Sequence, residues 1–336
     1  MRMLKGAPPR RAGRLMPRLL AAGLALVMTA GAFVGRAAAD WPDRPITVVV
    51  HFAPGGSNDL LGRLIASELG PVLGQSVVVV NKPGANGDIG VSFASRATPD
   101  GYTLLVASGS ALVNPATGKV SYDLLKDFAP VAYLGASPNV VLAGPAAGVA
   151  DFAELVAKAK ANPGKMTYGS PGVGSTPHLA MELIKLKLGL DILHIPFTGL
   201  GPAMTAVLGG QTDFSSTTVA GVMGNVRSGK LKPMVQTGTQ RWPELPDTPT
   251  VGEVGAPGAS SETSQMVLVP TGTPQPIIDR LSAEILKIMA KPEVKEKMLT
   301  AGFAVKGEGP AQLRQRMEKE IAMWKDVAER AGIRRE

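Results

Sequence analysis

The chain contains no cysteine among its 336 residues. Disulfide bonds, thiolate metal sites, cysteine nucleophiles and a lipidated N-terminal cysteine are therefore all excluded. With only three histidines, a histidine-rich metal site is not expected, and aromatic residues at 4% leave few platforms for stacking nucleic-acid bases. Charged residues make up 18% of the chain and hydrophobic residues 45%. This balance indicates a folded chain, and the length predicts two domains.

The positive charge of the chain is concentrated at its beginning. The formal charge is +8 and the sequence pI is about 9.7. Residues 1–39 hold seven basic residues and no acid, then an apolar run over 19–34 and the alanines 37–39. This order is typical of a secretory signal peptide, and we expect cleavage near Ala39 and a periplasmic location. The alternatives are an uncleaved anchor, for which the run is short, and twin-arginine export through Arg10 and Arg11.

The exported part of the chain is nearly neutral. Removing seven of the 35 basic residues leaves 28, against 27 acidic residues. A nucleic-acid interface needs a clustered basic face, and none is visible in the rest of the sequence. We therefore expect no nucleic-acid partner, and we expect the mature protein to be a soluble monomer.

Strands and helices alternate over most of the exported chain. A β-branched run at 46–50 is followed by a helical pattern around 60–69, a strand at 77–80, a helix at 88–97 and a strand at 102–106. This βαβαβ order predicts a parallel sheet. Two extended runs follow, then further helices and strands, and finally three terminal helices. Their expected ranges are 131–135 and 140–143 (extended), 151–160, 177–188, 202–208 and 219–228 (helices), 165–169, 192–196, 213–216, 231–237 and 264–269 (strands), and 276–290, 292–301 and 310–331 (terminal helices).

Three glycine-rich loops each follow a strand and lead into a helix. They cover residues 54–58, 83–87 and 169–176. Glycine allows the backbone to approach a ligand closely, and the free N–H groups and dipole of a helix N-terminus favour an anion. Any one loop could be an ordinary turn, but three such loops at strand ends favour an anion-binding cleft.

The motifs of common enzyme classes are missing. The chain has no P-loop, no G-x-G-x-x-G after the first strand, no G-x-S-x-G and no H-E-x-x-H. His178 and Glu182 lie four residues apart on a predicted helix, but no third metal ligand accompanies them. His51 and His194 lie in predicted strands, where a packing role is expected. The sequence therefore predicts neither a metal nor a cofactor.

Short motifs along the exported chain, such as Pro54-Gly55-Gly56 and Pro99-Asp100-Gly101-Tyr102, follow one another in a distinctive order. They lie at 41–46, 52–59, 81–90, 99–104, 126–131, 161–165, 194–197, 208–211, 246–250 and 270–274. In this order they resemble the Bug family, the TctC-type extracytoplasmic binding proteins of tripartite tricarboxylate transporters. The resemblance implies an α/β fold of the two-domain periplasmic binding protein type (type II, Venus-flytrap), with the ligand cleft between the domains. The implied division is 1–39 signal peptide, 40–141 plus 264–336 domain 1, and 142–263 domain 2.

The resemblance also implies a function and a site. A small organic carboxylate is held in the cleft, one carboxylate by the two loops of domain 1, largely through backbone N–H groups. Domain 2 contributes the loop 170–176 and the turn 197–199. The predicted ligand-binding residues are Phe52, Pro54, Gly55, Gly56, Ser57, Asn58, Asp59, Gly84, Ala85, Asn86, Gly87, Ser108, Ser110, Ser170, Gly174, Ser175, Thr176, His178, Thr198 and Thr217.

This chain departs from the family pattern where ligand specificity is set. Phe197-Thr198-Gly199 stands where the family often has Tyr-Lys-Gly, which removes a basic contact. The Phe-Asp-Asn that often follows Gly-Gly-Gln is replaced by 213–218, so that an acidic residue able to meet a ligand amine is absent or moved to Asp213. A tryptophan common in the family is replaced around Ser264 and Gln265. These changes predict a neutral, hydrogen-bonding distal pocket.

Three functions remain open at this point. The first is a periplasmic binding protein that delivers its carboxylate to membrane transporter subunits, without catalysis. The second is a sensory partner that presents the same ligand to a membrane receptor. The third is an exported hydrolase or lyase that uses His178 or Asp59.

Overall fold

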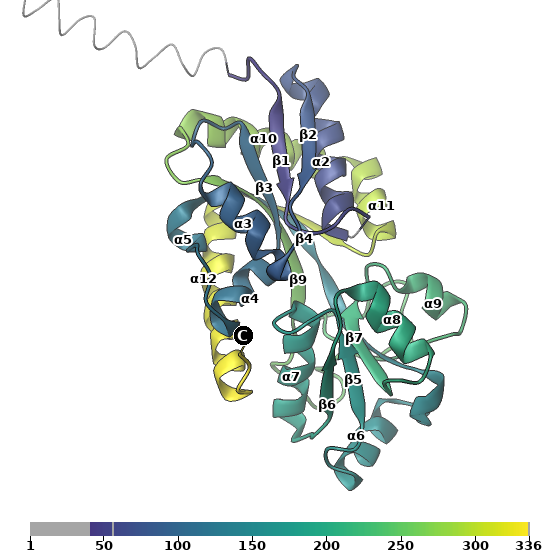
Figure 1. The fold of residues 1–336 in the computed structure, drawn as a ribbon. Coiled ribbons are helices and arrows are strands. Elements are labelled where there is room, and N and C mark those ends of the chain that lie inside the picture. Colours follow the sequence, from purple (N-terminus) through teal and green to yellow (C-terminus); the bar gives the residue numbers. More distant parts are fainter. Residues whose placement is uncertain (1–40, 56, 335–336) are drawn as a thin grey trace, which may run out of the picture. The chain divides into compact units, whose positions relative to one another are not determined.

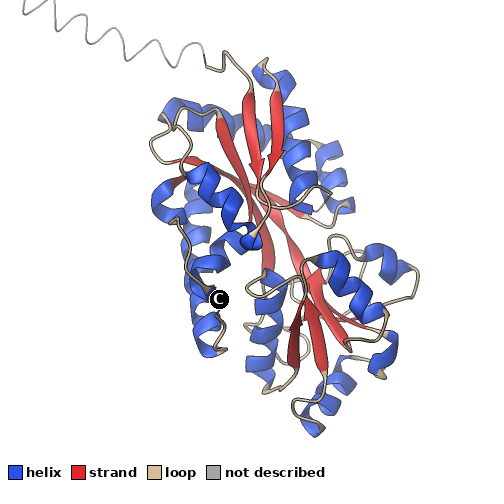
Figure 2. Cartoon of the chain, in the orientation of Figure 1, coloured by secondary structure: helices blue, strands red, loops and turns tan. Residues whose placement is uncertain are grey.

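The strands form one mixed sheet, whose order differs from the order along the chain (Figures 1 and 2). The computed structural model describes residues 41–55 and 57–334, so the predicted signal peptide and Gly56 lie outside the described residues. The described residues from Arg44 onward form one compact unit. In this unit the strand order is β2-β1-β3-β9-β4-β7-β5-β6, and β8 and β10 also pair with β4.

The elements have the following bounds. The strands are β1 (Ile46–Val50), β2 (Val77–Asn81), β3 (Thr103–Ser108), β4 (Phe128–Ala143), β5 (Thr167–Ser170), β6 (Leu193–Pro196), β7 (Phe214–Thr218), β8 (Lys232–Gln236), β9 (Glu262–Pro270) and β10 (Ala304–Glu308). The helices are α2 (Ser57–Leu73), η1 (Ala85–Gly87), α3 (Asp88–Ser95), α4 (Ser110–Thr117), α5 (Leu124–Asp127), η2 (Pro145–Ala147), α6 (Phe152–Ala161), α7 (Thr176–Leu188), α8 (Leu200–Leu208), α9 (Met223–Arg227), α10 (Gln275–Ala290), α11 (Pro292–Thr300) and α12 (Pro310–Arg330).

The sheet has two parallel parts. In the first, β1 pairs with β2 and β3. In the second, β5 pairs with β6 and β7. We call β1, β2 and β3 with α2, α3 and α4 the first lobe, and β5 to β8 with α6 to α9 the second lobe. The predicted parallel pairing is confirmed in the first lobe, and the antiparallel strands β4 and β9 run through the sheet between the two parallel parts.

Strand β4 differs from its prediction. The extended runs 131–135 and 140–143 are parts of one strand that passes through Pro130 and Pro138. A proline removes a ladder donor, which favoured two separate segments. The structure accommodates the prolines because β9 pairs with β4 from Phe128 to Pro138, with irregular register near Pro130 and Gly135, and β7 and β8 pair with the remainder of β4.

Helix boundaries follow the chemistry of their first residues. The side chain of Asp151 accepts a hydrogen bond from the N–H of Glu154 (2.8 Å) and so caps α6 at the start of the predicted helix. Helix α9 is shorter than predicted and begins only at Met223. The short elements α4, α5 and β10 were not predicted; α4 packs on α12 and β10 pairs with β4, whereas α5 is a four-residue helix capped by Asp123. None of the described helices combines the length and apolar character needed to cross a membrane.

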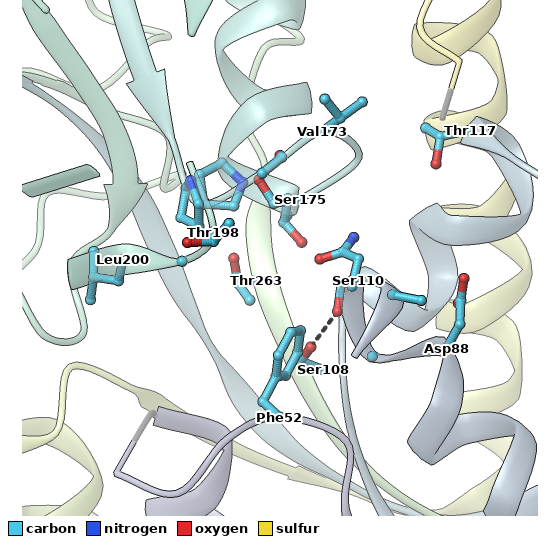
Figure 3. Close-up of a pocket in the computed structure, with 18 of the residues that line it drawn as sticks. Phe52, Asp88, Ser108, Ser110, Thr117, Val173, Ser175, Thr198, Leu200 and Thr263 are labelled. Atoms are coloured by element: carbon cyan, nitrogen blue, oxygen red, sulfur yellow. Dashed lines mark hydrogen bonds between the residues drawn. The ribbon is translucent and has the colours of Figure 1, made fainter. Parts of the chain in front are cut away.

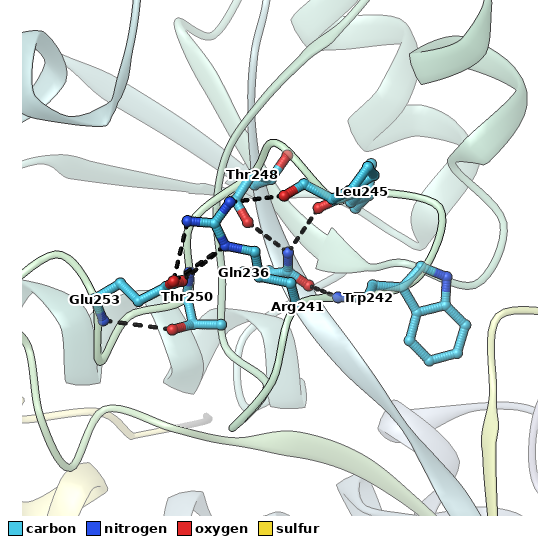
Figure 4. Close-up of polar contacts among 8 residues, drawn as sticks. Gln236, Arg241, Trp242, Leu245, Thr248, Thr250 and Glu253 are labelled. Carbon is cyan, nitrogen blue, oxygen red and sulfur yellow. Dashed lines mark hydrogen bonds and ion pairs between the residues drawn. The ribbon is translucent and has the colours of Figure 1, made fainter.

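A long segment without helix or strand in the second lobe is organised around Gln236, at the end of β8. Its Nε2 donates to the carbonyls of Leu245 (3.2 Å) and Thr248 (2.7 Å), and its Oε1 accepts from the N–H of Trp242 (2.6 Å; Figure 4). Gln236 is 0% exposed. One buried side chain thus bonds three backbone groups of this irregular segment, one of which, the Leu245 carbonyl, also accepts the N–H of Thr248 (3.2 Å).

An ion pair on the surface of the same segment adds to this arrangement. Arg241 Nε lies 3.1 Å from each carboxylate oxygen of Glu253, and its guanidinium also donates to the carbonyl of Pro246 (2.7 Å; Figure 4). The hydrogen bond from Arg241, with that from the N–H of Thr250, lowers the pKa of Glu253 to about 2. The pair is exposed to solvent, so its contribution to stability is small.

Helix α12 covers the crossing strands and brings a carboxyl group against them. Ser264 donates to Oε1 of Glu320 (2.7 Å), and the hydroxyl groups of Tyr133 and Ser264 lie 3.2 Å apart. The other oxygen, Oε2, is buried without a hydrogen-bond partner among the described residues. Burial outweighs the neighbouring Arg316 and raises the pKa of Glu320 to about 7. The carboxyl group is therefore largely protonated below neutral pH.

We expect Gln236→Met to destabilise the protein by on the order of 3 kcal/mol. Methionine fills a similar volume, but the Thr248 carbonyl and the Trp242 N–H lose their partner in a buried place, and the Leu245 carbonyl keeps only the N–H of Thr248. Urea unfolding measures the change, with the exposed Gln211→Met as the matched control. Equal stability of the two variants would contradict the role assigned to Gln236.

The pH dependence of stability tests the environment of Glu320. Because the pKa is about 7 in the folded protein and ordinary in the unfolded chain, this group contributes stability below about pH 4.5 that is lost as the pH rises through 7. Glu320→Gln removes this loss, so the variant should show a shallower decline of unfolding free energy between pH 5 and 8. The exposed Glu318→Gln on the same helix is the control. Identical profiles for Glu320→Gln and wild type would refute the assignment.

Candidate functional site

A cavity of about 2060 Å³ is lined by loops of both lobes and by the end of α12 (Figure 3). In the close-up, Phe52, Ser108 and Ser110 lie on the first-lobe side, facing Ser175 and Thr198 of the second lobe. The first-lobe loops stand at the carboxyl ends of β1 and β2, and the loop after β5 contributes the opposite wall. This is the place where open α/β sheets bind ligands.

The loop that enters α2 is held by an acidic side chain below it. Asp59 accepts hydrogen bonds from Gly55 N–H (2.9 Å), Arg63 Nε (2.9 Å) and Asn81 Nδ2 (2.9 Å). Although burial alone would raise it, these bonds together hold the pKa of Asp59 below its ordinary value. Gly55 has φ +84°, a conformation that L side chains rarely adopt. Asp59 thus shapes the loop and does not line the cavity.

The second first-lobe loop is a left-handed turn. Gly84, Ala85, Asn86 and Gly87 have successive φ values of 124°, 48°, 54° and 94°. Residues other than glycine rarely take such values, and backbone strain of this kind is stored at binding sites. Asn86 is fixed by a reciprocal pair with Asn114, through Nδ2–Oδ1 (2.8 Å) and Nδ2 to the Asn86 carbonyl (3.0 Å).

His51 supports this turn from below. A Cβ on Gly87 would come within 2.2 Å of His51 Nδ1, and one on Gly90 within 2.6 Å of His51 Cβ. The ring Nε2 accepts the N–H of Ser108 (2.9 Å), and Ser108 Oγ lies 2.8 Å from Ser110 Oγ. Burial lowers the pKa of His51 to about 4, so the imidazole under the turn is neutral at physiological pH. The glycines are thus required by close packing, and His51 lies just after its strand, not within it.

The second-lobe loop is also organised by a neutral histidine. Gly174 N–H donates to His178 Nδ1 (3.1 Å), and Ser175 caps α7. The His178 ring stacks on His194 with centroids 3.9 Å apart, and His194 Nε2 lies 2.7 Å from Ser170 Oγ. Burial lowers the pKa of His178 to about 2 and that of His194 to about 4. Both imidazoles therefore support the loop as uncharged groups.

Glu182, which lies four residues after His178 in the sequence, makes its hydrogen bonds with other residues. Glu182 accepts from Tyr168 OH (2.5 Å) and pairs with Lys185 Nζ (2.7 Å). No group of three or more His, Asp or Glu residues suited to a metal ion occurs among the described residues. Asp213, considered for a ligand amine, instead accepts from Thr167 N–H (2.8 Å) and lies outside the cavity lining.

Charge is sparse in the cavity. The described lining residues with charged side chains are Asp88, Lys119, Lys325, Glu329 and Arg334, at the ends of α4 and α12 and the start of α3. None of the described residues that the second lobe contributes to the lining is charged. The two first-lobe loops themselves thus offer an anion backbone N–H groups and hydroxyls, and the basic residue that the first lobe adds to the described lining is Lys119, after α4.

The predicted site residues divide into three groups. Those that line the cavity are Phe52, Pro54, Gly55, Ser57, Asn58, Gly84, Ala85, Asn86, Gly87, Ser108, Ser110, Ser175, Thr176, Thr198 and Thr217. Those that stand behind the lining are Asp59, Ser170, Gly174 and His178, whose side chains or backbone are bound within the loops. Gly56 lies outside the described residues.

Several lining residues were not predicted as part of the site. They come from the end of α4 (115–119), the start of α8 (200–202), β9 (Thr263 and Gln265) and the end of α12 (325–334). The departure from the family pattern around Ser264 and Gln265 indicated that β9 could contribute to the site. The end of α12 had no signal, because its approach to α4 and α7 depends on the tertiary fold.

Comparison with known proteins agrees with this architecture. A family model described as the tripartite tricarboxylate transporter family receptor, TctC, matches residues 61–333. The protein BugT of Bordetella pertussis is 34% identical over 322 residues, which cover 95% of this chain and 99% of BugT.

Two similar solved structures contain small acids. Rpa4515 of R. palustris, with adipate, has a TM-score of 0.82 and 31% identity, covering 88% of this chain and 99% of that one. MatC of Rhodopseudomonas palustris, with bound malate, has a TM-score of 0.76 and 32% identity, covering 85% and 99%. The α/β periplasmic binding protein fold and the predicted resemblance are thereby confirmed, and the chain belongs to the TctC (Bug) family of tripartite tricarboxylate transporter receptors.

Proposed function

We propose that this protein captures a small organic carboxylate in its cavity and releases it unchanged to a transport system. The observation that carries the proposal is the pair of first-lobe loops, one entering α2 and one forming the left-handed turn 84–87, which meet at one end of the cavity. The adipate of Rpa4515 and the malate of MatC support a carboxylate as the ligand.

The first turn of α2 supplies the physical basis for anion binding. The first N–H groups of a helix have no intrahelical partner, and the helix dipole places partial positive charge there. Gly55 has a left-handed backbone conformation, and a Cβ added at this position would have no other atom within 4 Å. A ligand therefore has room to approach the backbone here. A carboxylate held in this way needs no basic side chain, in agreement with the two loops, which contribute none to the described lining.

We propose that the lobes correspond to two domains, 40–141 with 264–336 and 142–263, that close on the ligand. The support is the arrangement of β4 and β9, which lead from one parallel part of the sheet to the other. Closure would bring the 170–176 loop over a carboxylate bound to the first lobe and exclude water.

The proposed role is without catalysis. Asp59 and His178, the residues considered for hydrolysis or elimination, are both engaged behind the lining and do not reach the cavity. We further propose that residues 1–39 direct export to the periplasm and are removed, that the mature protein is a monomer, and that membrane transporter subunits receive the ligand. Co-purification of the membrane partner distinguishes delivery to a transporter from presentation to a sensory receptor.

Isothermal titration of the exported protein against small carboxylates tests the function. The set contains adipate, succinate, malate, butyrate and phenylacetate, with the uncharged amide of each acid as control. We expect at least one acid to bind with a micromolar or lower Kd, while its amide binds far more weakly because it lacks the charge that α2 favours. Absence of binding by every acid, with native mass spectrometry showing no co-purified acid, would overturn the proposal.

Ala85→Leu tests the position of the site. Leucine adds volume at the left-handed turn, directly in the cavity, without changing the charge. We expect the affinity for the bound acid to fall at least about tenfold, since overpacking of a filled site costs roughly 1–3 kcal/mol. The control is Ala157→Leu on the exposed face of α6. An unchanged Kd in a folded Ala85→Leu variant would show that the ligand lies elsewhere.

A further inference from the structure

Two buried amide side chains meet at the wall of the cavity. Asn58, the second residue of α2, donates from Nδ2 to Oε1 of Gln265 on β9 at 2.8 Å. Asn58 is 3% and Gln265 1% exposed, and both line the cavity. The pair joins two segments 207 residues apart at the place where the helix N-terminus faces the ligand space.

The pair leaves one amide oxygen and one NH2 group outside its own hydrogen bond. With Nδ2 used by Gln265, Asn58 keeps its Oδ1, which is buried and has no hydrogen-bond partner among the described residues. Gln265 keeps its amide donor, Nε2. Exchanging O and N in both amides reverses the direction of the bond but still leaves one amide oxygen and one NH2 group outside it. The requirement therefore does not depend on how the two amides are oriented.

The need for a partner that both donates and accepts a hydrogen bond distinguishes among the functional groups that a ligand could carry. A carboxylate accepts only, and would leave the acceptor unsatisfied. An ammonium group donates only and needs a counter-charge, but the acidic residues among the described lining are only Asp88 and Glu329. Asp88 already accepts from Asn114 Nδ2 (2.6 Å) and Tyr122 OH (2.7 Å). A hydroxyl group donates and accepts at one atom, and it satisfies both amides without charge.

The opposite wall has the same neutral character. Thr176 and Thr217 are each 1% exposed, line the cavity and have hydroxyl oxygens without a hydrogen-bond partner among the described residues. Buried polar groups of this kind are costly unless a ligand or water pairs with them. They favour a ligand with polar, uncharged substituents.

We propose that Asn58 and Gln265 are specificity-determining residues that recognise a hydroxyl group on the ligand, so that the substrate class is a hydroxy carboxylate. This inference rests on the proposed carboxylate-binding function. The hydroxyl lies near the carboxylate, because Asn58 belongs to the same first turn of α2 whose N–H groups receive the anion. A deoxy acid leaves the acceptor of the pair unsatisfied when the cavity closes.

Ligands that differ only by a hydroxyl group test the proposal with the wild-type protein. The pairs are malate with succinate, mandelate with phenylacetate and 3-hydroxybutyrate with butyrate, each measured by isothermal titration. We expect the hydroxy acid of any pair that binds to have a Kd at least about tenfold lower than the deoxy acid. Equal or tighter binding of the deoxy acids would overturn the proposal while leaving carboxylate binding intact. Binding of none of the acids would instead overturn the proposed function.

Substitution of the two amide side chains tests whether this pair causes the preference for hydroxy acids. In Gln265→Met and in Asn58→Leu, which keep similar side-chain volumes, the ratio of the deoxy and hydroxy Kd values should fall from about ten or more to near one. The exposed Gln240→Met is the control and should keep the wild-type ratio. Thermal unfolding shows that each variant is folded. A tenfold ratio that persists in a folded Gln265→Met variant would show that another group reads the hydroxyl, or that an ordered water pairs with the amides.

Discussion

The pairing of β4 with β9 is the interaction on which the rest of the structure depends. These antiparallel strands are hydrogen-bonded from Phe128 with Pro270 to Pro138 with Glu262, and they carry both parallel parts of the sheet. β3 is attached to β9, and β7, β8 and β10 are attached to β4. The loops at the ends of β1, β2 and β5 therefore reach one cavity only because this ladder sets their positions.

The proposed carboxylate site has a nearly uncharged second-lobe wall. Two of the loops rest on buried imidazoles, His51 below the turn 84–87 and His178 behind Gly174, and burial keeps both neutral. Charge in the described lining is confined to the ends of α4 and α12 and the start of α3. Backbone N–H groups are fixed dipoles that need no reorganisation when an anion arrives, so a neutral wall is compatible with recognition of a carboxylate. The amide pair of Asn58 and Gln265 then adds discrimination that net charge would not provide.

The sequence predicted the features that depend on neighbouring residues and missed those that depend on contacts between distant segments. Strands such as β1 and helices such as α6 were predicted because a β-branched run or a capping aspartate acts within a few residues. β10 and α4 were missed, and β4 was divided in two, because partners far along the chain stabilise them. Glycine-rich loops marked much of the cavity in advance, since a left-handed backbone and a helix start are local features. Asp59 and His178 lay in the right loops but act behind the lining, which only their hydrogen-bond partners reveal.

The sequence by itself determined the α/β alternation, the family motifs and the concentration of basic residues before residue 40. Each of these is a property of neighbouring residues, so it needs no knowledge of the fold. Only the tertiary structure decided that Gln265 meets Asn58, that Ser264 meets Glu320 and that the end of α12 borders the cavity. These contacts join segments separated by up to 207 residues. Their donors, acceptors and burial arise only when the sheet has brought those segments together.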